Sequence, residues 1–206
     1  MQEKFIIGVM SGTSLDGIDI AIMKKAGACA LEENGNKDED RVLVPVLHHY
    51  EEFPLALKIS LKELIEIAPN IIEKYFCDAK FVLKETYNQG FLKRTQNLEH
   101  QYSIFASSVI QKAIKKANLK NEDIELIGLH GQTIYHAPAN YFTWQIGCGR
   151  TISDKLNIDV INNFRIKNVL EGGQGAPLAQ AYHLHLVQSV PAELFPVGII
   201  NIGGIS

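Results

Sequence analysis

The sequence predicts an α/β protein, and three observations lead to this class. The chain opens with two apolar runs, at residues 5–10 and 20–23, that flank a short polar turn. Residues 98–117 repeat apolar side chains every three or four positions, as a helix with one buried face does. Residues 125–129 form an apolar run that passes directly into polar residues. A helix followed by such a strand is half of a doubly wound unit, in which ligands bind beyond the carboxyl ends of the strands.

The opening turn has the composition of an anion-binding hairpin. Residues 5–10 are a short apolar run, which is typical of a strand buried on both faces. The turn holds two glycines, two hydroxyls and one carboxylate: Gly12, Gly17, Thr13, Ser14 and Asp16. Backbone N–H groups and hydroxyls can hold a phosphate, and a carboxylate beside it requires a metal ion or its water shell in between. The turn therefore predicts a site for the phosphate tail of Mg-nucleotide, and an ordinary hairpin turn is the alternative.

The next segments extend this sheet and begin to cover it. Residues 42–50 are a third strand, with Pro45 marking an edge, so that three strands form an antiparallel meander. A helix starts at residues 53–54, and its apolar stripe is interrupted at Pro69. Residues 70–97 mix aromatic and lysine side chains, and we interpret them as a helix or a loop insertion. Such a mixture can stack on nucleic acid, but the acidic total charge favours a helix that packs its aromatic side chains.

Polar side chains follow three later strands. Strands are expected at 125–129, 142–147 and 158–161, with helices at 149–156 and 178–188. Their ends carry His130, Gln145, Asn163 and Arg165, and parallel strands would deliver such ends to one edge of the sheet. A guanidinium binds carboxylates or phosphates bidentately, although a salt bridge would use Arg165 equally well. A lone histidine such as His130 can equally be structural.

Two further segments complete the predicted fold. Residues 172–177 carry three glycines in four positions and predict a loop that approaches a ligand closely. Residues 197–206 are expected to be an apolar strand that runs into a glycine turn. This pattern echoes the opening of the chain, and we expect it to begin a second half of the fold.

Composition excludes several classes of protein. The 206 residues are 46% hydrophobic and 21% charged, with a net charge of −3, which gives no basic excess for nucleic acid. No signal peptide and no apolar run of about 20 residues is visible, so no membrane segment is expected. The three cysteines form no CxxC pair, which predicts neither a zinc site nor a disulfide framework and favours the cytoplasm. The GxxxxGK[ST] and GxGxxG phosphate motifs are also absent.

Five motifs together resemble the anhydro-N-acetylmuramic acid kinase family. They are GVMSGTSLDGID at 8–19, GLHGQTIYH at 128–136, QIG at 145–147, GGQGAPL at 172–178 and NIGG at 201–204. They occur in the family's order and reach nearly from one end of the chain to the other, as in the N-terminal portion of such a kinase. Residues 70–97 carry no motif of this family.

The resemblance implies an actin-like ATPase or sugar-kinase fold of the ribonuclease H-like type. Residues 1–190 would be the N-terminal lobe, with 70–97 as a candidate insertion, and 195–206 would start a second lobe. The family uses MgATP to convert 1,6-anhydro-N-acetylmuramic acid, an amino sugar of cell-wall recycling, into N-acetylmuramic acid 6-phosphate, with hydrolytic opening of the anhydro ring.

The matching motifs imply which residues of this chain form the family's binding sites. The implied ATP-binding residues are Gly12, Thr13, Ser14, Leu15, Asp16, Gly17, Ile18 and Asp19, and Asp16 could reach a metal ion through water. The expected substrate-binding residues are His130, Gly131, Gln132, Gln145, Asn163 and Arg165.

The chain also departs from the family's pattern. Asn163 and Asn168 stand where the family usually has aspartate. The family's catalytic carboxylate lies in a Phe-Asp-x-Gly-Pro-Gly-Asn motif beyond Ser206, so no catalytic residue is expected within these residues and the chain alone is expected to be inactive. The alternatives are a non-catalytic module that binds sugar or nucleotide, and a half-enzyme completed by a second polypeptide. The resemblance further implies a homodimer for the full-length family.

Overall fold

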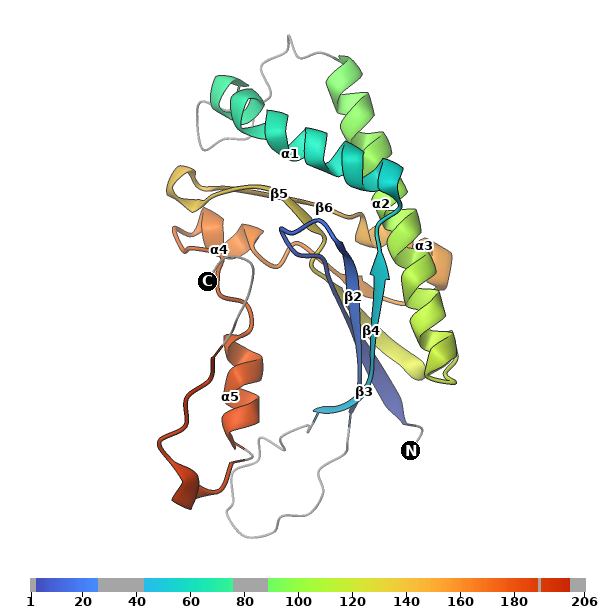
Figure 1. Ribbon diagram of the computed structural model, residues 1–206, viewed down its shortest axis with the longest axis vertical. Coiled ribbons are helices and arrows are strands. Elements are labelled where there is room, and N and C mark those ends of the chain that lie inside the picture. The colour runs from blue at the N-terminus through green and yellow to red at the C-terminus, as the bar shows by residue number, and fades with distance from the viewer. Residues whose placement is uncertain (1–2, 26–42, 76–88, 189, 201–206) are drawn as a thin grey trace.

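The computed structural model describes residues 3–25, 43–75, 89–188 and 190–200, which form a mixed α/β fold (Figure 1). One five-stranded sheet has the order β3-β2-β1-β4-β7, and β5 and β6 form a separate two-stranded sheet. The strands are β1 Lys4–Met10, β2 Gly17–Lys25, β3 Leu43–Glu52, β4 Ile124–Leu129, β5 Gln132–Ala137, β6 Phe142–Ile146 and β7 Val160–Ile161. The helices are α1 Leu55–Tyr75, α2 Gln89–Lys116, α3 Gly149–Leu156, α4 Ile166–Leu170 and α5 Gln180–Gln188, with 3-10 turns at Asn121–Asp123, Pro138–Asn140 and Ala192–Leu194.

The larger sheet combines a meander with a parallel pair. β1, β2 and β3 pair antiparallel in sequence order, which confirms the predicted meander. β4 then lies parallel to β1 on its other side, and β7 lies parallel to β4. The hydrogen bond from the His130 N–H to the Val9 carbonyl, 2.9 Å long, continues the β1–β4 pairing past the last strand residue. The end of β4 therefore lies directly beside the end of β1 and the turn that follows it.

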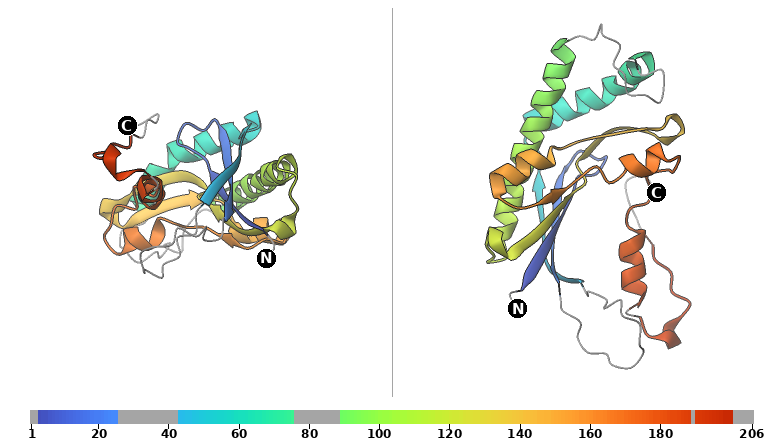
Figure 2. Two further views of the ribbon diagram at one scale, coloured as in Figure 1. Left: turned by 90° about the horizontal axis from the view of Figure 1, so that it is seen from below. Right: turned by 180° about the vertical axis from the view of Figure 1, so that it is seen from behind.

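Only one face of β1 is buried, so the prediction of burial on both faces was wrong. Phe5, Ile7 and Val9 are buried, while Gly8 and Met10, on the opposite face, are exposed. Side chains alternate between the faces of a strand, and the described helices α1 and α2 pack over the first face only. Figure 2 shows these two helices together on the same side of the sheet.

Helix α1 continues through Pro69, where the sequence predicted an interruption. The buried stripe runs through Leu57, Leu61, Leu64, Ala68 and Ile72. The apolar pattern also predicts Leu55 and Ile59 in the stripe, but both are exposed. Burial of apolar side chains on both sides of the proline outweighs the hydrogen bond that its missing N–H cannot make.

Helix α2 begins at Gln89, nine residues before the predicted start at residue 98. Residues 89–97 are mostly polar, so the apolar periodicity of the helix cannot be seen there. The predicted apolar face is confirmed, since Tyr102, Ala106, Val109, Ile110 and Ala113 are fully buried. The preceding residues 76–88, and with them most of the candidate insertion, lie outside the described residues.

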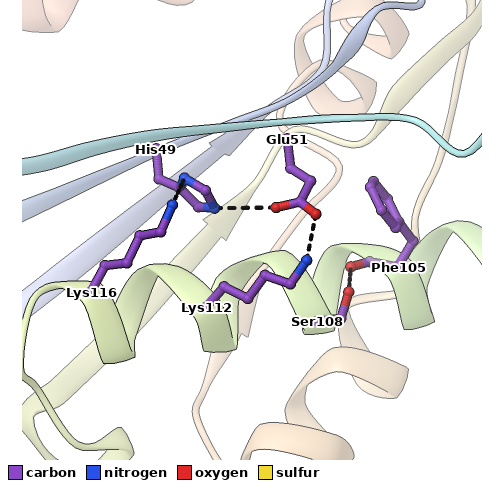
Figure 3. A network of polar contacts seen from close by, with 6 residues as sticks. All are labelled: His49, Glu51, Phe105, Ser108, Lys112 and Lys116. Carbon is purple, nitrogen blue, oxygen red and sulfur yellow. Dashed lines mark hydrogen bonds and ion pairs between the residues drawn. The ribbon is translucent and has the colours of Figure 1, made fainter.

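A polar network ties the edge strand β3 to α2 (Figure 3). The Glu51 carboxylate lies 3.5 Å from His49 Nε2 and accepts a hydrogen bond from Lys112. The Lys116 ammonium donates to His49 Nδ1 at 3.1 Å. The pKa of Glu51 lies below its usual value, mainly because of the Lys112 hydrogen bond.

The C-terminal segment packs little against the rest of the described fold. Helices α3 and α5 (Figure 1) confirm two predicted helices. No described side chain of α5 is buried. Residues 197–200, expected in a strand, form none, because no described strand offers them hydrogen-bonding partners. Residues 201–206 lie outside the described residues, so the start of a second lobe at 195–206 stays a prediction.

Candidate functional site

The turn between β1 and β2 is closed by its own polar groups. The Ser14 hydroxyl donates to Asp16 Oδ1 at 2.7 Å, and the Gly17 N–H donates to the same oxygen at 3.0 Å. Leu15 adopts a positive φ of 54°, and its N–H donates to the Gly12 carbonyl at 3.3 Å. The Ser14 hydrogen bond is the main reason why the pKa of Asp16 is lowered. The turn thus presents an ionised carboxylate and the exposed side chains of Thr13 and Ser14 at its tip.

Buried hydroxyls hold the base of this turn against the end of β4. The Ser11 hydroxyl donates to the Gly131 carbonyl at 3.0 Å and lies 2.9 Å from the Tyr102 hydroxyl. Since the Ser11 proton is used in the first bond, Tyr102 is the donor in the second. Burial raises the pKa of Tyr102, so the phenol keeps this proton. Gln132 Nε2 adds a 3.1 Å hydrogen bond to the Gly12 carbonyl.

The contact of the turn with the end of β4, made by Ser11, Gln132 and the Gly131 carbonyl, is called the junction below. His130 and Arg165 meet beside it. The Arg165 Nε–H donates to His130 Nε2 at 3.0 Å, and His130 Nδ1 lies 2.7 Å from the Gly131 carbonyl, which can only accept. His130 is 7% exposed, and burial lowers its pKa, against the hydrogen bond to the Gly131 backbone, which raises it; the Arg165 charge lowers it further. The imidazole is therefore neutral at neutral pH, and both of its nitrogens have protein partners.

Arg165 also holds the glycine-rich loop. Its Nη1 donates to the Gly175 carbonyl at 2.5 Å, while the Gly175 N–H donates to Asn168 Oδ1 at 2.7 Å. A Cβ at Gly173 would collide with that same Asn168 oxygen, so the loop passes over Asn168 only because residue 173 is glycine. The predicted close-approach loop thus packs against α4 and Arg165.

One face of the β5–β6 hairpin is polar and lies next to this loop. Gln145 Nε2 contacts Thr143 Oγ1 at 2.8 Å, and His136 Nδ1 lies 2.9 Å from the same hydroxyl. Burial lowers the pKa of His136, and Arg165 lowers it further, against a hydrogen bond to the Gln174 backbone that raises it. The hairpin therefore supplies a row of hydrogen-bonding groups at the edge of the loop.

Gln145 reaches the site by a different route from the one we predicted. β6 pairs antiparallel with β5 and does not belong to the larger sheet, so no parallel strand delivers this side chain. Only β4 and β7 follow the predicted rule, bringing His130 and Arg165 to one edge. The hairpin instead folds back from the end of β4 and places Gln145 behind Gly131, where a methyl group on that glycine would lie 3.6 Å from the Gln145 Cβ.

Two buried amide oxygens have no partner among the described residues. Oε1 of Gln132 and Oε1 of Gln145 are both inaccessible and accept no hydrogen bond there. Buried acceptors are normally satisfied, since leaving one unpaired costs about 1–3 kcal/mol. Both oxygens are therefore free to accept a hydrogen bond if their side chains turn toward a donor.

The other predicted site residues lie elsewhere. The Asn163 side chain is exposed and makes none of these hydrogen bonds, while its φ of 62° suits an asparagine in a turn. Leu15 and Ile18 are buried in the core, so only their backbones can face a ligand. Asp19 Oδ1 lies 2.9 Å from His48 Nε2 on β3.

Four residues of these hydrogen-bonded contacts were not among the predicted site residues: Ser11, Tyr102, His136 and Asn168. Ser11 and His136 stand inside quoted motifs, but next to residues with more obvious chemistry. Tyr102 was assigned to an apolar stripe, although a hydroxyl at a fully buried position is itself a signal.

The described part of the chain contains no group of three or more His, Cys, Asp or Glu side chains that could hold a metal ion. Within the same residues no helix is both long enough and apolar enough to cross a membrane.

Comparison with known proteins gives a consistent set of matches. A family profile described as anhydro-N-acetylmuramic acid kinase matches residues 78–206. Proteins of that name from Brucella canis and Nitrobacter winogradskyi are 33% and 31% identical to this chain over 98% and 97% of its length. A third, from Rhodopseudomonas palustris, is 32% identical over 97% of the chain. The matches cover 48%, 47% and 47% of these relatives, so the chain spans about half of their length.

Proposed function

This chain belongs to the anhydro-N-acetylmuramic acid kinase family, and we propose that it forms the part of a sugar kinase that holds the ATP phosphates and one side of the sugar. The observation that supports this most is the junction described above. It joins the Gly12 turn to the end of β4 through Ser11 and Gln132, and joins that end to the glycine-rich loop through Arg165. Because the carboxyl edge of β1 and β4 gathers all three, phosphate and sugar would meet there.

The proposed reaction is the ATP-dependent conversion of 1,6-anhydro-N-acetylmuramic acid. Water adds a hydroxyl at C1 as the C1–O6 bond breaks, and O6 takes the γ-phosphoryl group of ATP, leaving ADP. The proton released by water requires a general base. The one carboxylate that the structure places in the Gly12 turn, Asp16, is engaged by Ser14 and Gly17. We therefore expect the base to come from outside this part of the family's chain.

Each side of the junction has a proposed task. Thr13 would donate to the nucleotide phosphates from the tip of the turn, where it is exposed, and Ser14 would do so by giving up its hydrogen bond to Asp16. Gln132 and Gln145 would accept hydrogen bonds from sugar hydroxyl or amide groups after their side chains turn the unpaired oxygens, which are inaccessible here, toward the ligand. The central sheet order β3-β2-β1-β4-β7, with a meander joined to a parallel pair, is consistent with the actin-like ATPase fold that we propose for this lobe.

Magnesium fits this site only as part of MgATP. Asp16 is the one acidic side chain of the turn tip, and its Oδ1 already accepts two hydrogen bonds. Mg²⁺ retains several waters and binds substrate phosphates with one or two carboxylates. Asp16 would thus contact the ion through water, and the ion would neutralise charge on the phosphates.

Calorimetry on the 206-residue chain with MgATP and with anhydro-N-acetylmuramic acid tests the proposal. We expect Ser14→Asp to weaken MgATP binding by about tenfold, because it places a second carboxylate beside the phosphates, and to leave sugar binding unchanged. We expect Gln145→Met to weaken sugar binding by about tenfold and to leave MgATP unchanged. Binding of neither ligand, or insensitivity to both variants, would contradict the assignment. An ADP-release assay completes the test, and rapid turnover would refute the expected inactivity of this chain alone.

A second candidate, a half-enzyme completed by another polypeptide, is favoured by one observation. Leu184, Leu194 and Ile200 are 61%, 62% and 84% exposed at the C-terminal end of the described chain. Large exposed apolar patches mark interaction surfaces. If this candidate is correct, adding the half of a relative that this chain does not match, as a separate polypeptide, should produce turnover. A cytoplasmic location and a homodimeric full-length enzyme remain proposals as well.

A further inference from the structure

A continuous set of hydrogen bonds runs from helix α2 to the glycine-rich loop. It starts in the buried core and ends at Gly175, a buried residue of the loop. In order, Tyr102 donates to Ser11, Ser11 to the Gly131 carbonyl, His130 Nδ1 to that same carbonyl, Arg165 Nε to His130 Nε2 and Arg165 Nη1 to the Gly175 carbonyl. The hydrogen bond from Arg165 to His130 lies at the centre of the set. The two ends are connected only while this bond is present.

The chemistry of the partners fixes the proton on the imidazole. A guanidinium can only donate, so His130 Nε2 must carry a lone pair toward Arg165 Nε, 3.0 Å away. A backbone carbonyl can only accept, so the proton lies on Nδ1, 2.7 Å from the Gly131 oxygen. This Nδ1–H form is the less common tautomer of a free histidine side chain, and it is selected here by its two partners.

We propose that Arg165 is a positioning residue, which holds His130 in the neutral Nδ1–H tautomer and through this pair connects the Gly12 turn to the glycine-rich loop. Neither ring nitrogen is then available to a ligand without breaking one of these bonds. Arg165 itself has two of its donor nitrogens engaged by the protein. This pair therefore orients the Gly12 turn and the glycine-rich loop, and residues of these two segments contact the ligand.

The surroundings of the pair support a neutral imidazole. A second proton on Nε2 would point at the Arg165 Nε–H and break the central bond. The groups that face the pair are His136 from β5, which the Arg165 charge also affects, and Tyr102 from α2 behind Ser11. Among the described residues, Arg165 is the one charged group that shifts the pKa of His130, and no carboxylate offsets it.

This inference does not depend on the proposed function, and nitrogen NMR tests it without a ligand. In the ¹⁵N-histidine-labelled chain at neutral pH, we expect the His130 signals to show a protonated Nδ1 and an unprotonated Nε2. Arg165→Met removes the donor and the charge, so an Nε2–H tautomer should appear beside the Nδ1–H form that the Gly131 carbonyl still favours, and the pKa of His130 should rise. Arg165→Lys keeps the charge but not the fork, and we expect it to restore the tautomer only in part.

Hydrogen exchange tests the connection between the loops. Arg165→Met should speed amide exchange by about tenfold both in residues 172–177 and around Gly131. Arg150→Met is the matched control, because the Arg150 side chain is 89% exposed on α3 and should change neither measurement. An Nε2–H or charged His130 in the unaltered chain would overturn the proposal, even if Arg165→Met failed to fold. So would an unchanged tautomer in Arg165→Met, and faster exchange in the glycine-rich loop alone would overturn the connection.

Discussion

The two asparagines that depart from the family's usual aspartate are in different situations. Asn168 uses Oδ1 to accept the Gly175 N–H, and a carboxylate could accept the same bond. Asn163 holds a left-handed turn with its side chain in solvent, where asparagine and aspartate are both tolerated. Neither replacement removes a hydrogen bond that the described fold needs. The substitutions are therefore compatible with an intact first half of the site.

Gly131 is a residue at which a side chain would be costly. Its φ is +77°, and a Cβ at this position would collide with the Ile146 carbonyl. Gly131→Ala should lower the free energy of unfolding by roughly 2–4 kcal/mol, because a backbone atom cannot move aside and the conformation is strained. Urea denaturation followed by circular dichroism measures this loss.

Gly8→Ala provides the control for that measurement. Gly8 lies in neighbouring β1, and a Cβ at this position would have no atom within 4 Å beyond its chain neighbours. We expect a change of less than about 0.5 kcal/mol, since surface substitutions away from special features have small effects. Equal losses in the two variants would show that the contact with Ile146 does not matter.

At the scale of elements, those set by local periodicity were predicted from the sequence, whereas those set by tertiary packing were not. The meander, β4 and the apolar face of α2 follow from local periodicity and are confirmed. Three parallel strand ends were predicted to meet at one edge, and two of them do, which brings His130 and Arg165 together. The third, β6, lies in another sheet. The separate β5–β6 hairpin was missed, because an apolar run does not reveal which strand it will pair with. The passage of α1 through Pro69 was missed because tertiary burial overrides a local breaker.

Pro69 in α1 offers a direct stability test. A proline inside a helix lacks the N–H that would bond to the carbonyl four residues earlier, here that of Ile65. Pro69→Ala should raise the free energy of unfolding by about 1–3 kcal/mol, measured by urea denaturation. Asn70→Ala, at the exposed neighbouring position, should change it by less than about 0.5 kcal/mol. A loss of stability in Pro69→Ala would mean that the proline ring packs usefully in the core.

The β3–α2 network predicts a dependence of stability on acid. The pKa of Glu51 lies below its usual 4.5, chiefly through the Lys112 hydrogen bond, so the folded chain binds this proton less readily than the unfolded chain. Its contribution is therefore present above the unfolded pKa and is lost as pH falls through the folded pKa. Lys112→Met should reduce the loss of stability between about pH 7 and about pH 3. The urea midpoints of Lys112→Met are measured at both pH values. Lys115→Met, which replaces an exposed lysine on the same helix, is the control.

At the scale of the whole molecule, burial is uneven. The core joins β1, β2 and β4 to α1, α2 and α3, whereas α5 and residues 190–200 run side by side away from it (Figures 1 and 2). Exposed apolar side chains in that region include Tyr182, Leu184, Leu186, Leu194, Phe195, Ile199 and Ile200. Scattered apolar side chains are normal on a surface, but a group of this size favours association.

Charged substitutions in this group should suppress that association without destabilising the fold. In the double variant Leu184→Lys, Leu194→Lys, both side chains are already more than half exposed, so the free energy of unfolding should change by less than about 0.5 kcal/mol. Sedimentation velocity across a concentration series should show oligomers for the unaltered chain and a larger monomer fraction for the variant, because lysine ammonium groups repel one another. Leu170→Lys, at a 44% exposed position on α4, controls for the added charge and should leave the oligomers in place. If the unaltered chain is a monodisperse monomer at every concentration, the apolar group is no association surface, and the half-enzyme loses the observation that favours it.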